Sequence, residues 1–423
     1  MRASLKIGIT FRMGGMINMT YDVIVVGAGP SGSSAAYFNA KQGKRVLLLD
    51  KVSFPRDKVC GDGITGKALT LLWEMGLGDK LNEIKEITSS GVVIVAPNRK
   101  ELSIPIHAPD DPLSAFSIER EILDNLIFER AKEAVVDAGG NVLFEAVKEP
   151  IIEDGKVIGV KTKEQNYYGS VVVGAGGYNC PISRYVLDLN SDMRQDRKHY
   201  SSAIREYWQG ISGNNGDFEI HFIDGILPGY FWIFPISDER VNIGVGMLLD
   251  DMDNQSIKLK EMLSYIINES YLSDRFTNAT KIEKSQKGWL LPLGSPRGNK
   301  HSPRKNFTDG CILVGDAASL IDPFTGEGIG NALMSGKLTA NYNQIDEETG
   351  LDYQQQLWAL IGTELTNSHR LQQMLKRKWL INWFIRKASK KPKLQMILTD
   401  MLHNKDTQGS FNSKWFLIKS LLF

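Results

Sequence analysis

The segment "YDVIVVGAGPSGSSAAYFNAKQGKRVLLLD", residues 21–50, decides the fold. Residues 23–26 are a short apolar run rich in β-branched side chains, which is typical of a buried parallel strand. A glycine-rich turn follows, then residues 33–42, which can form a helix, and residues 45–49, which form a second apolar strand. The order of strand, turn, helix and strand predicts a Rossmann-type unit in an α/β protein.

The turn holds three glycines in the spacing G-x-G-x-x-G. Gly27 permits the tight turn, Gly29 lets the backbone approach a pyrophosphate, and Gly32 lets helix and strand pack closely. The free N–H groups at the start of the helix favour phosphate, and Asp50 stands where a ribose-binding acid is expected. Together these features predict a dinucleotide site. The alternative is a glycine turn in some other α/β protein.

A second glycine-rich turn lies late in the chain, in "CILVGDAASLIDPFTGEGIGNALMSGKLTA", residues 311–340. A buried strand precedes it and a helix follows it. The acid after the strand can accept hydrogen bonds from ribose or ribityl hydroxyls, and the start of the helix can face a developing negative charge. The residues that we expect to contact the cofactor are Gly315, Asp316, Pro323, Gly326 and Gly328.

The late turn resembles a known flavin motif. Its pattern G-D-A-A-x(4)-P-x-x-G-x-G is similar to that of the FAD-dependent fold shared by p-hydroxybenzoate hydroxylase, flavin halogenases and geranylgeranyl reductases. The resemblance implies FAD as the cofactor, and an FAD-binding domain with an inserted antiparallel β-sheet for the substrate. It also implies that Arg120, which opens the amphipathic segment "REILDNLIFERA", supports the FAD phosphates. The alternative for Arg120 is a solvated helix charge.

The stretch "GYFWIFP", residues 229–235, places three aromatic residues at alternate positions. In a strand Tyr230, Trp232 and Phe234 share one face, while Phe231 and Ile233 point the other way. By itself the pattern fits either ordinary sheet core or the wall of a site for a flat, apolar ligand.

Three stretches resemble the geranylgeranyl reductase family in particular. They are "FPRDKVCGDGIT" at 54–65, with its Cys-Gly-x-Gly turn, the Y-x-W-x-F-P pattern of 230–235, and "GWLLPLG" at 288–294. The family implies a reductase that saturates isoprenoid double bonds with hydride from reduced flavin. Tyr230, Trp232 and Phe234 then bind the substrate. Cys60 is the candidate proton donor or site organiser; otherwise it packs in a tight turn.

One departure from related proteins concerns the electron donor. Many relatives carry an Asp-Gly pair after a mid-chain strand, where this chain has Gly176 and Gly177 in "VVVGAGGYNCPISR". The missing acid weakens a conventional NADPH-dependent hydroxylase interpretation and leaves NADPH, NADH or ferredoxin as the reductant. A monooxygenase or halogenase on the same scaffold is the alternative enzyme, and a flavin carrier without turnover is the alternative of another class.

Composition limits the partners. The 423 residues are 42% hydrophobic, and a formal net charge of +1 gives no case for nucleic acid. The cysteines Cys60, Cys180 and Cys311 are far apart, which argues against a disulfide scaffold and a Cys-rich metal site and fits a reducing cytoplasm. No apolar run of about 18 residues suggests a transmembrane helix.

We expect a discontinuous domain arrangement. Residues 1–20 are interpreted as an N-terminal extension, disordered or upstream of the true start. The predicted FAD-binding domain comprises residues 21–85, 115–180 and 305–345. The predicted substrate domain comprises residues 86–114 and 181–304, and residues 346–423 are the C-terminal helical segment.

The C-terminal segment is basic and amphipathic. Within "KRKWLINWFIRKASKKPK", residues 376–393, Trp379, Leu380, Trp383 and Phe384 recur at helical spacing, and no residue is acidic. Such a stretch can lie on an anionic membrane surface. It can equally be a packed helix with a solvated basic face. Peripheral membrane contact is therefore an expectation that the sequence leaves open.

Overall fold

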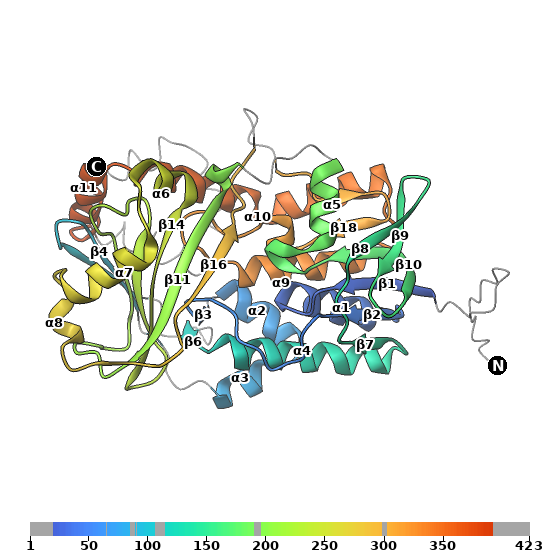
Figure 1. Ribbon diagram of the computed structural model, residues 1–423, viewed down its shortest axis with the longest axis horizontal. Helices are drawn as coiled ribbons and strands as arrows, with labels where there is room; N and C mark the ends of the chain where they lie inside the picture. The colour runs from blue at the N-terminus through green and yellow to red at the C-terminus, as the bar shows by residue number, and fades with distance from the viewer. Residues whose placement is uncertain are drawn as a thin grey trace.

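The computed structural model describes residues 20–64, 66–84, 89, 91–105, 115–189, 196–297 and 303–391. The expected extension before residue 20 and the chain after residue 391 lie outside the described residues. The described chain forms two lobes, each built on one large sheet (Figure 1).

The first sheet has eight strands in the order β17-β18-β10-β1-β2-β7, and β9 and β8 are added beside β10. Five of these strands run parallel to one another, namely β18, β10, β1, β2 and β7. The apolar, β-branched run of residues 23–26 predicts this arrangement. The bounds are β1 Thr20–Val26, β2 Val46–Leu49, β7 Asn141–Leu143, β8 Glu149–Glu153, β9 Lys156–Lys161, β10 Asn166–Gly174, β17 Phe307–Thr308 and β18 Cys311–Leu313.

Helix α1 lies between β1 and β2, as the sequence predicts, and packs against α4 and α9. It begins at Pro30, three residues before the predicted start, because proline suits the first helical position, where no N–H is needed. The helices of this lobe are α1 Pro30–Lys41, α2 Gly66–Glu74, α3 Gly78–Ile84, α4 Arg120–Asp137, α5 Pro181–Leu189 and α9 Ile329–Leu338.

The second sheet also has eight strands, in the order β15-β11-β14-β13-β12-β4-β5, with β16 beside β11. All its pairs are antiparallel except β12 with β4. The bounds are β4 Gly91–Val95, β5 Glu101–Pro105, β11 Tyr200–Gln209, β12 Phe218–His221, β13 Tyr230–Pro235, β14 Arg240–Leu248, β15 Thr280–Lys281 and β16 Lys287–Pro292. The four strands predicted between residues 200 and 250 are confirmed.

One face of the second sheet packs against helix α7, Leu259–Asn268, and forms an apolar core. Phe231 and Ile233 lie in this core and are completely buried. The predicted orientation of these two side chains, opposite to the aromatic residues of the same strand, is therefore confirmed. Helices α6, Leu249–Gln255, and α8, Ser273–Phe276, lie in the same lobe (Figure 1).

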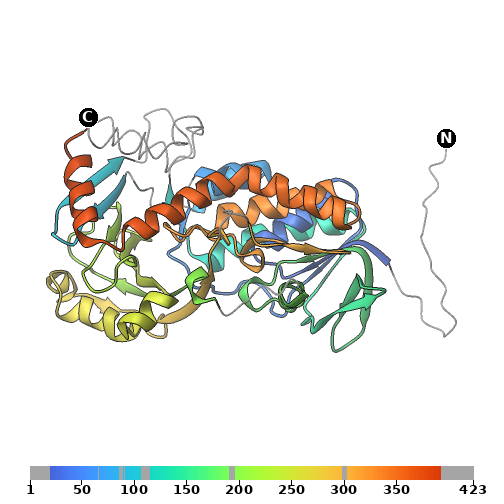
Figure 2. The same ribbon diagram turned by 90° about the horizontal axis from the view of Figure 1, so that it is seen from above.

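Two elements connect the lobes. The long helix α10, Glu347–Met374, runs from the first lobe to the second, and α11, Lys378–Ala388, then packs against β5 (Figure 2). A small sheet of β3, Gly63–Ile64, and β6, Phe116–Ser117, lies between the two large sheets (Figure 1). The 3-10 turns are η1 Gly177–Asn179, η2 Arg197–His199, η3 Gly315–Ala318 and η4 Thr339–Asn341.

Candidate active site

A cavity of about 1500 Å³ lies between the two sheets and receives side chains from both. Residues from both glycine turns, from the Cys-Gly-x-Gly turn and from the aromatic strand line it. The predicted site residues on its wall are Gly27, Gly29, Asp50, Cys60, Arg120, Asp316, Pro323, Gly326, Gly328, Tyr230, Trp232 and Phe234. Gly32 and Gly315 support the wall from behind.

The first glycine turn is shaped for a close backbone approach. Gly27 has φ +104°, and a Cβ there would lie 2.6 Å from the Ala175 carbonyl oxygen. A Cβ on Gly32 would lie 1.7 Å from the Gly27 oxygen, so only glycine allows α1 to pack here. Gly29 faces open space apart from Arg56, and no described side chain caps the start of α1. The N–H groups there are available to a phosphate.

Asp50 lies at the end of β2, beside this turn. Its Oδ2 accepts a hydrogen bond from the Ala28 N–H at 2.7 Å, and its Oδ1 accepts one from the Val52 N–H at 3.1 Å. Two backbone donors therefore fix the carboxylate, which keeps further lone pairs for ribose hydroxyls.

The second glycine turn meets the first. Gly315 has φ +57°, and a Cβ there would lie 2.7 Å from Ser31 Oγ. Asp322 Oδ1 accepts hydrogen bonds from the N–H groups of Phe324 and Thr325, which shapes the loop before α9. Helix α9 begins at Ile329, after the glycine-rich turn as predicted, and no described side chain caps it. Two uncapped helix N-termini thus reach one cavity, and a long diphosphate cofactor such as FAD fits between them.

The aromatic face, which comprises Tyr230, Trp232 and Phe234, looks into the cavity. The Trp232 indole lies over Gly244, its partner on β14, where a Cβ would lie 2.2 Å from the ring. Phe234 contacts the Cys-Gly-x-Gly turn so closely that a Cβ on Gly61 would lie 2.9 Å from the Phe234 ring. The Tyr230 hydroxyl donates to the Thr325 carbonyl oxygen of the loop before α9. The aromatic face therefore contacts both cofactor-side loops.

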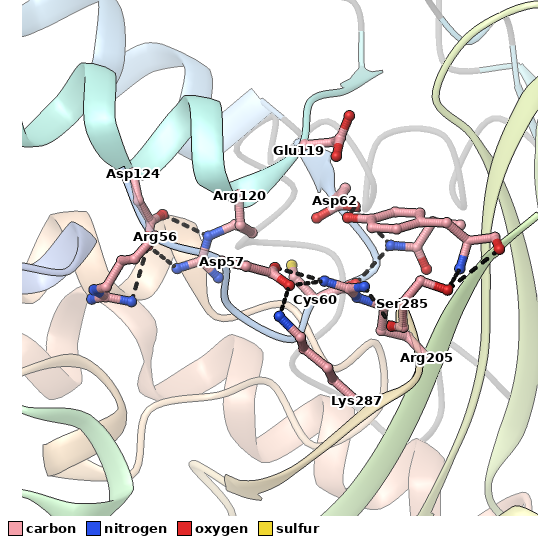
Figure 3. A network of polar contacts seen from close by, with 12 residues as sticks. Arg56, Asp57, Cys60, Asp62, Glu119, Arg120, Asp124, Arg205, Ser285 and Lys287 are labelled. Atoms are coloured by element: carbon pink, nitrogen blue, oxygen red, sulfur yellow. Dashed lines mark hydrogen bonds and ion pairs between the residues drawn. The ribbon is translucent and has the colours of Figure 1, made fainter. Parts of the chain in front are cut away.

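The Cys-Gly-x-Gly turn is held by buried polar groups (Figure 3). Asp62 is completely buried and has φ +67°. Its Oδ2 accepts hydrogen bonds from the Tyr207 hydroxyl at 2.6 Å and from Asn242 Nδ2 at 2.7 Å. Burial raises the pKa of the Cys60 thiol, although the Arg120 guanidinium opposes this. At neutral pH the thiol therefore keeps its proton, as a proton donor must.

Arg120 opens α4, as predicted, but its nearest partners belong to the protein. Its Nε and Nη2 donate to the two carboxylate oxygens of Asp124 at 2.6 and 2.8 Å, and its positive charge opposes the rise in the pKa of the nearby Cys60 thiol. Arg120 is 7% exposed, so the alternative of a solvated helix charge is wrong. A contact with the FAD phosphates stays a prediction.

The far part of the cavity is lined by apolar side chains from the second sheet and from α11. We call it the apolar arm. It comprises Val92, Ile94, Ile104, Phe218, Ile220, Phe222, Leu380, Trp383 and Phe384. Most of these residues belong to one packed apolar cluster, to which the buried face of α11 contributes Ile381, Ile385 and Ala388. Trp379 does not belong to the packed face of α11, because its side chain is 64% exposed.

Comparison with known proteins decides the family. The FAD binding domain family matches residues 20–182. The menaquinone reductase of Mycobacterium tuberculosis is 31% identical over 328 residues, which are 75% of each chain. The digeranylgeranylglycerophospholipid reductase of Thermoplasma volcanium is 31% identical over 376 residues, 86% of each chain. The chain belongs to the geranylgeranyl reductase family of FAD-dependent oxidoreductases.

Solved structures support the fold of this reductase. A geranylgeranyl bacteriochlorophyll reductase-like protein of Thermoplasma acidophilum has a TM-score of 0.76 and 21% identity, with 91% of this chain and 97% of that chain covered. A flavin-dependent brominase has a TM-score of 0.66 at 20% identity, over 92% and 95% of the two chains. The predicted fold class, the enzyme class and FAD as the cofactor are confirmed.

The sequence interpretation missed residues that complete the site of the reductase. Arg56, in the loop after β2, lies 3.9 Å from Asp50 and 3.6 Å from the position of a Cβ on Gly29. The basic residues of the loop "FPRDK" could have indicated Arg56 as a site residue. Gly244 lies opposite Trp232 and makes room for its ring, and Gly246 lies opposite Tyr230. Alternate glycines in "NIGVGML" could have indicated them.

The structure also predicts a pH-dependent stability. Burial raises the pKa of Asp62 from 3.8 to about 6, although hydrogen bonds from Tyr207 and Asn242 oppose the rise. The unfolded chain therefore loses this proton at lower pH than the folded protein does. The contribution of Asp62 to stability thus falls as pH rises from about 4 to about 6 and is constant above that range.

We predict that the stability of the wild type relative to Asp62→Asn falls by about 3 kcal/mol in all from about pH 3 to about pH 7, mostly between about pH 4 and pH 6, because one pKa unit corresponds to ~1.4 kcal/mol. The amide in Asp62→Asn can accept the same two hydrogen bonds but cannot titrate. Urea unfolding of both proteins at several pH values measures the difference. A difference that is independent of pH would show that Asp62 does not titrate in this range.

Proposed function

We propose that the enzyme saturates isoprenoid double bonds of a lipid or prenyl substrate. The observation that carries this proposal is the continuity of the cavity: the glycine turns line one end, the apolar arm lines the other, and Cys60 and the aromatic face lie where they meet. A long apolar chain suits the arm, since burial of each CH₂ group contributes about 0.8 kcal/mol. The names of the relatives, reductases of menaquinone and of digeranylgeranylglycerophospholipid, support the same substrate class.

Each part of the site has a distinct task in this proposal. The two glycine turns would hold FAD, which in its reduced form would supply hydride. The cofactor end is shaped by the glycines Gly27, Gly29, Gly32, Gly315, Gly326 and Gly328, and the cofactor would be contacted by Asp50, Arg120, Asp316 and Pro323. The aromatic face holds the alkene flat at reacting distance. The thiol of Cys60 donates a proton to one alkene carbon.

The test of this function is a single turnover without oxygen. The bound FAD is reduced anaerobically and mixed with lipids that carry geranylgeranyl chains. We expect the flavin to be reoxidised and the product to gain two hydrogens per double bond, as mass spectrometry would show. Reoxidation that requires O₂, with a product that gains oxygen or halogen, would instead indicate the alternative monooxygenase or halogenase.

The variant Cys60→Ala tests the proton donor. It should bind FAD with an unchanged flavin spectrum but slow the alkene step by about 10²–10⁴-fold, the usual contribution of a general acid. Stopped-flow absorbance of the reduced enzyme measures this rate. An unchanged rate would leave Cys60 with a packing role only.

We infer that α11 carries the enzyme to an anionic membrane surface. Trp379 is 64% exposed on this helix, while Leu380, Trp383 and Phe384 line the apolar arm beneath it. Basic residues stand at both ends of α11: Arg377 and Lys378 beside Trp379, and Arg386, Lys387, Lys390 and Lys391 at the end of the helix and just after it. The same helix would thus contact lipid on one side and the bound chain on the other. In the part of the chain that the structure describes, no helix is long and apolar enough to cross a bilayer.

Cosedimentation with vesicles that contain phosphatidylserine tests the membrane contact. We expect binding at low salt, weakened by Trp379→Ala and by Lys387→Glu, since each basic residue near such a surface contributes about 1 kcal/mol. Trp73→Ala is the matched control, because Trp73 is 42% exposed and lies on α2. Absence of binding at low salt, or equal loss with Trp73→Ala, would contradict the inference.

A further inference from the structure

Asn242 is a completely buried amide at the third position of the apolar strand β14. A buried amide without partners costs about 2–7 kcal/mol. Asn242 has partners at both ends: its Oδ1 accepts a hydrogen bond from the Trp232 indole N–H at 2.9 Å, and its Nδ2 donates to the Cys60 carbonyl oxygen at 2.8 Å and to Asp62 Oδ2 at 2.7 Å. The orientation of the amide is determined, because an indole only donates and a peptide carbonyl only accepts.

This one side chain therefore connects the aromatic face to the turn that carries Cys60. The turn has a strained backbone, since Asp62 has φ +67° and a non-glycine residue in that region costs of order 1–3 kcal/mol. The hydrogen bonds from Asn242, together with the one from the Tyr207 hydroxyl, hold the carbonyl of Cys60 and the carboxylate of Asp62 in place. The position of Cys60 relative to Trp232 depends on these bonds.

The conformation of the turn also decides what contacts the sulfur of Cys60. Figure 3 shows Cys60 close to Arg120 and Asp62, and Arg120 is itself held by Asp124. Burial raises the pKa of the thiol, and the charge of the Arg120 guanidinium acts against that rise. A positive charge at this place favours a thiolate, which is the state that remains after the thiol has given up its proton.

We propose that Asn242 is a positioning residue for alkene protonation: it fixes the Cys60 thiol at one place beside the aromatic face. This inference rests on the proposed function. In the step, the S–H bond of Cys60 breaks and a C–H bond forms on one alkene carbon, while the other carbon would take hydride from reduced FAD. The positive charge of Arg120 stabilises the thiolate until water reprotonates it. A misplacement of about 1 Å can slow such a step by ~10²-fold.

The first test compares Asn242→Leu with a matched variant, Asn39→Leu. Asn39 is also a completely buried amide, but it lies in α1 and its Nδ2 donates to the Ala35 oxygen and to Thr339 Oγ1. Two rates are measured: anaerobic reoxidation of reduced FAD by a geranylgeranyl lipid, and alkylation of Cys60 by iodoacetamide as a function of pH. The other two cysteines are at most 1% exposed, so they should react little. Alkylation of Cys60→Ala measures their background reaction.

We expect Asn242→Leu to retain FAD, to reoxidise it about 100-fold more slowly with the lipid, and to shift the pH dependence of Cys60 alkylation. Asn39→Leu should lower the stability but keep both rates. The inference is overturned if Asn242→Leu keeps both rates within twofold of the wild type, or if Asn39→Leu changes them to the same extent.

A second variant, Asn242→Asp, serves if Asn242→Leu does not fold. It keeps the shape and the acceptor for Trp232 but loses the two Nδ2 hydrogens, and it places a carboxyl group beside Asp62. Two neighbouring carboxyl groups share a proton at low pH, and that proton restores one hydrogen bond. The rate of Asn242→Asp relative to the wild type should therefore rise as the pH falls, and a constant ratio would contradict the inference.

The two proposals fail in different ways. A wild-type enzyme that reduces none of the prenyl substrates contradicts the proposed function. The alkylation of Cys60 needs no substrate, so an altered pH dependence in Asn242→Leu still supports the placement of the thiol by Asn242. If the wild type reduces no prenyl substrate, alkylation is the remaining readout, and an unaltered pH dependence then overturns the inference.

Discussion

The backbone of helix α1 is in direct contact with the glycine turn that follows strand β1 on one side and with helix α9 on the other. Glycine permits each contact: a Cβ on Gly32 would lie 1.7 Å from the Gly27 oxygen, and a Cβ on Gly336 would lie 2.3 Å from the Ser31 oxygen. Because these backbones touch, the N-termini of α1 and α9 reach the same cavity, although they are far apart in sequence. The cofactor end of the site follows from this packing.

The contact between the two lobes depends on an ion pair that contains a buried charge. Arg205, on β11, is completely buried and donates to both carboxylate oxygens of Asp57, which lies in the loop before Cys60, at 2.6 and 2.7 Å. Lys287, on β16, contacts the same carboxylate (Figure 3). Loss of the Asp57 carboxylate would leave the buried Arg205 guanidinium uncompensated, which costs about 3–5 kcal/mol. The loop that follows β2 is thereby tied to the substrate-side sheet.

The fold and the cofactor end could be predicted because local patterns determine them. The G-x-G-x-x-G turn, the acid at the end of the second strand and the late glycine turn each express a short-range requirement of the backbone, so each is visible in a few consecutive residues. The alternation around Trp232 likewise predicted which side chains share a face, since the side-chain period of a strand is two. The helix boundaries were less certain, as the start of α1 at Pro30 shows.

The partners of the polar side chains could not be predicted, because they come from distant segments. No sequence pattern distinguishes Asn242 or Tyr207 from the other residues of their strands. Only the pairing of those strands brings both side chains to Asp62. Arg120 illustrates the same point, since its contact with Cys60 depends on how α4 meets the small sheet.

The sequence by itself determined that this chain binds FAD on a Rossmann-type sheet, because the spacing of glycines along the chain is a local property of the backbone. Only the tertiary structure decided that Cys60, Trp232 and Asn242 form one unit beside the apolar arm. The physical reason is that hydrogen bonds between buried groups, and the cavities that they surround, arise only after sheets and helices have packed together.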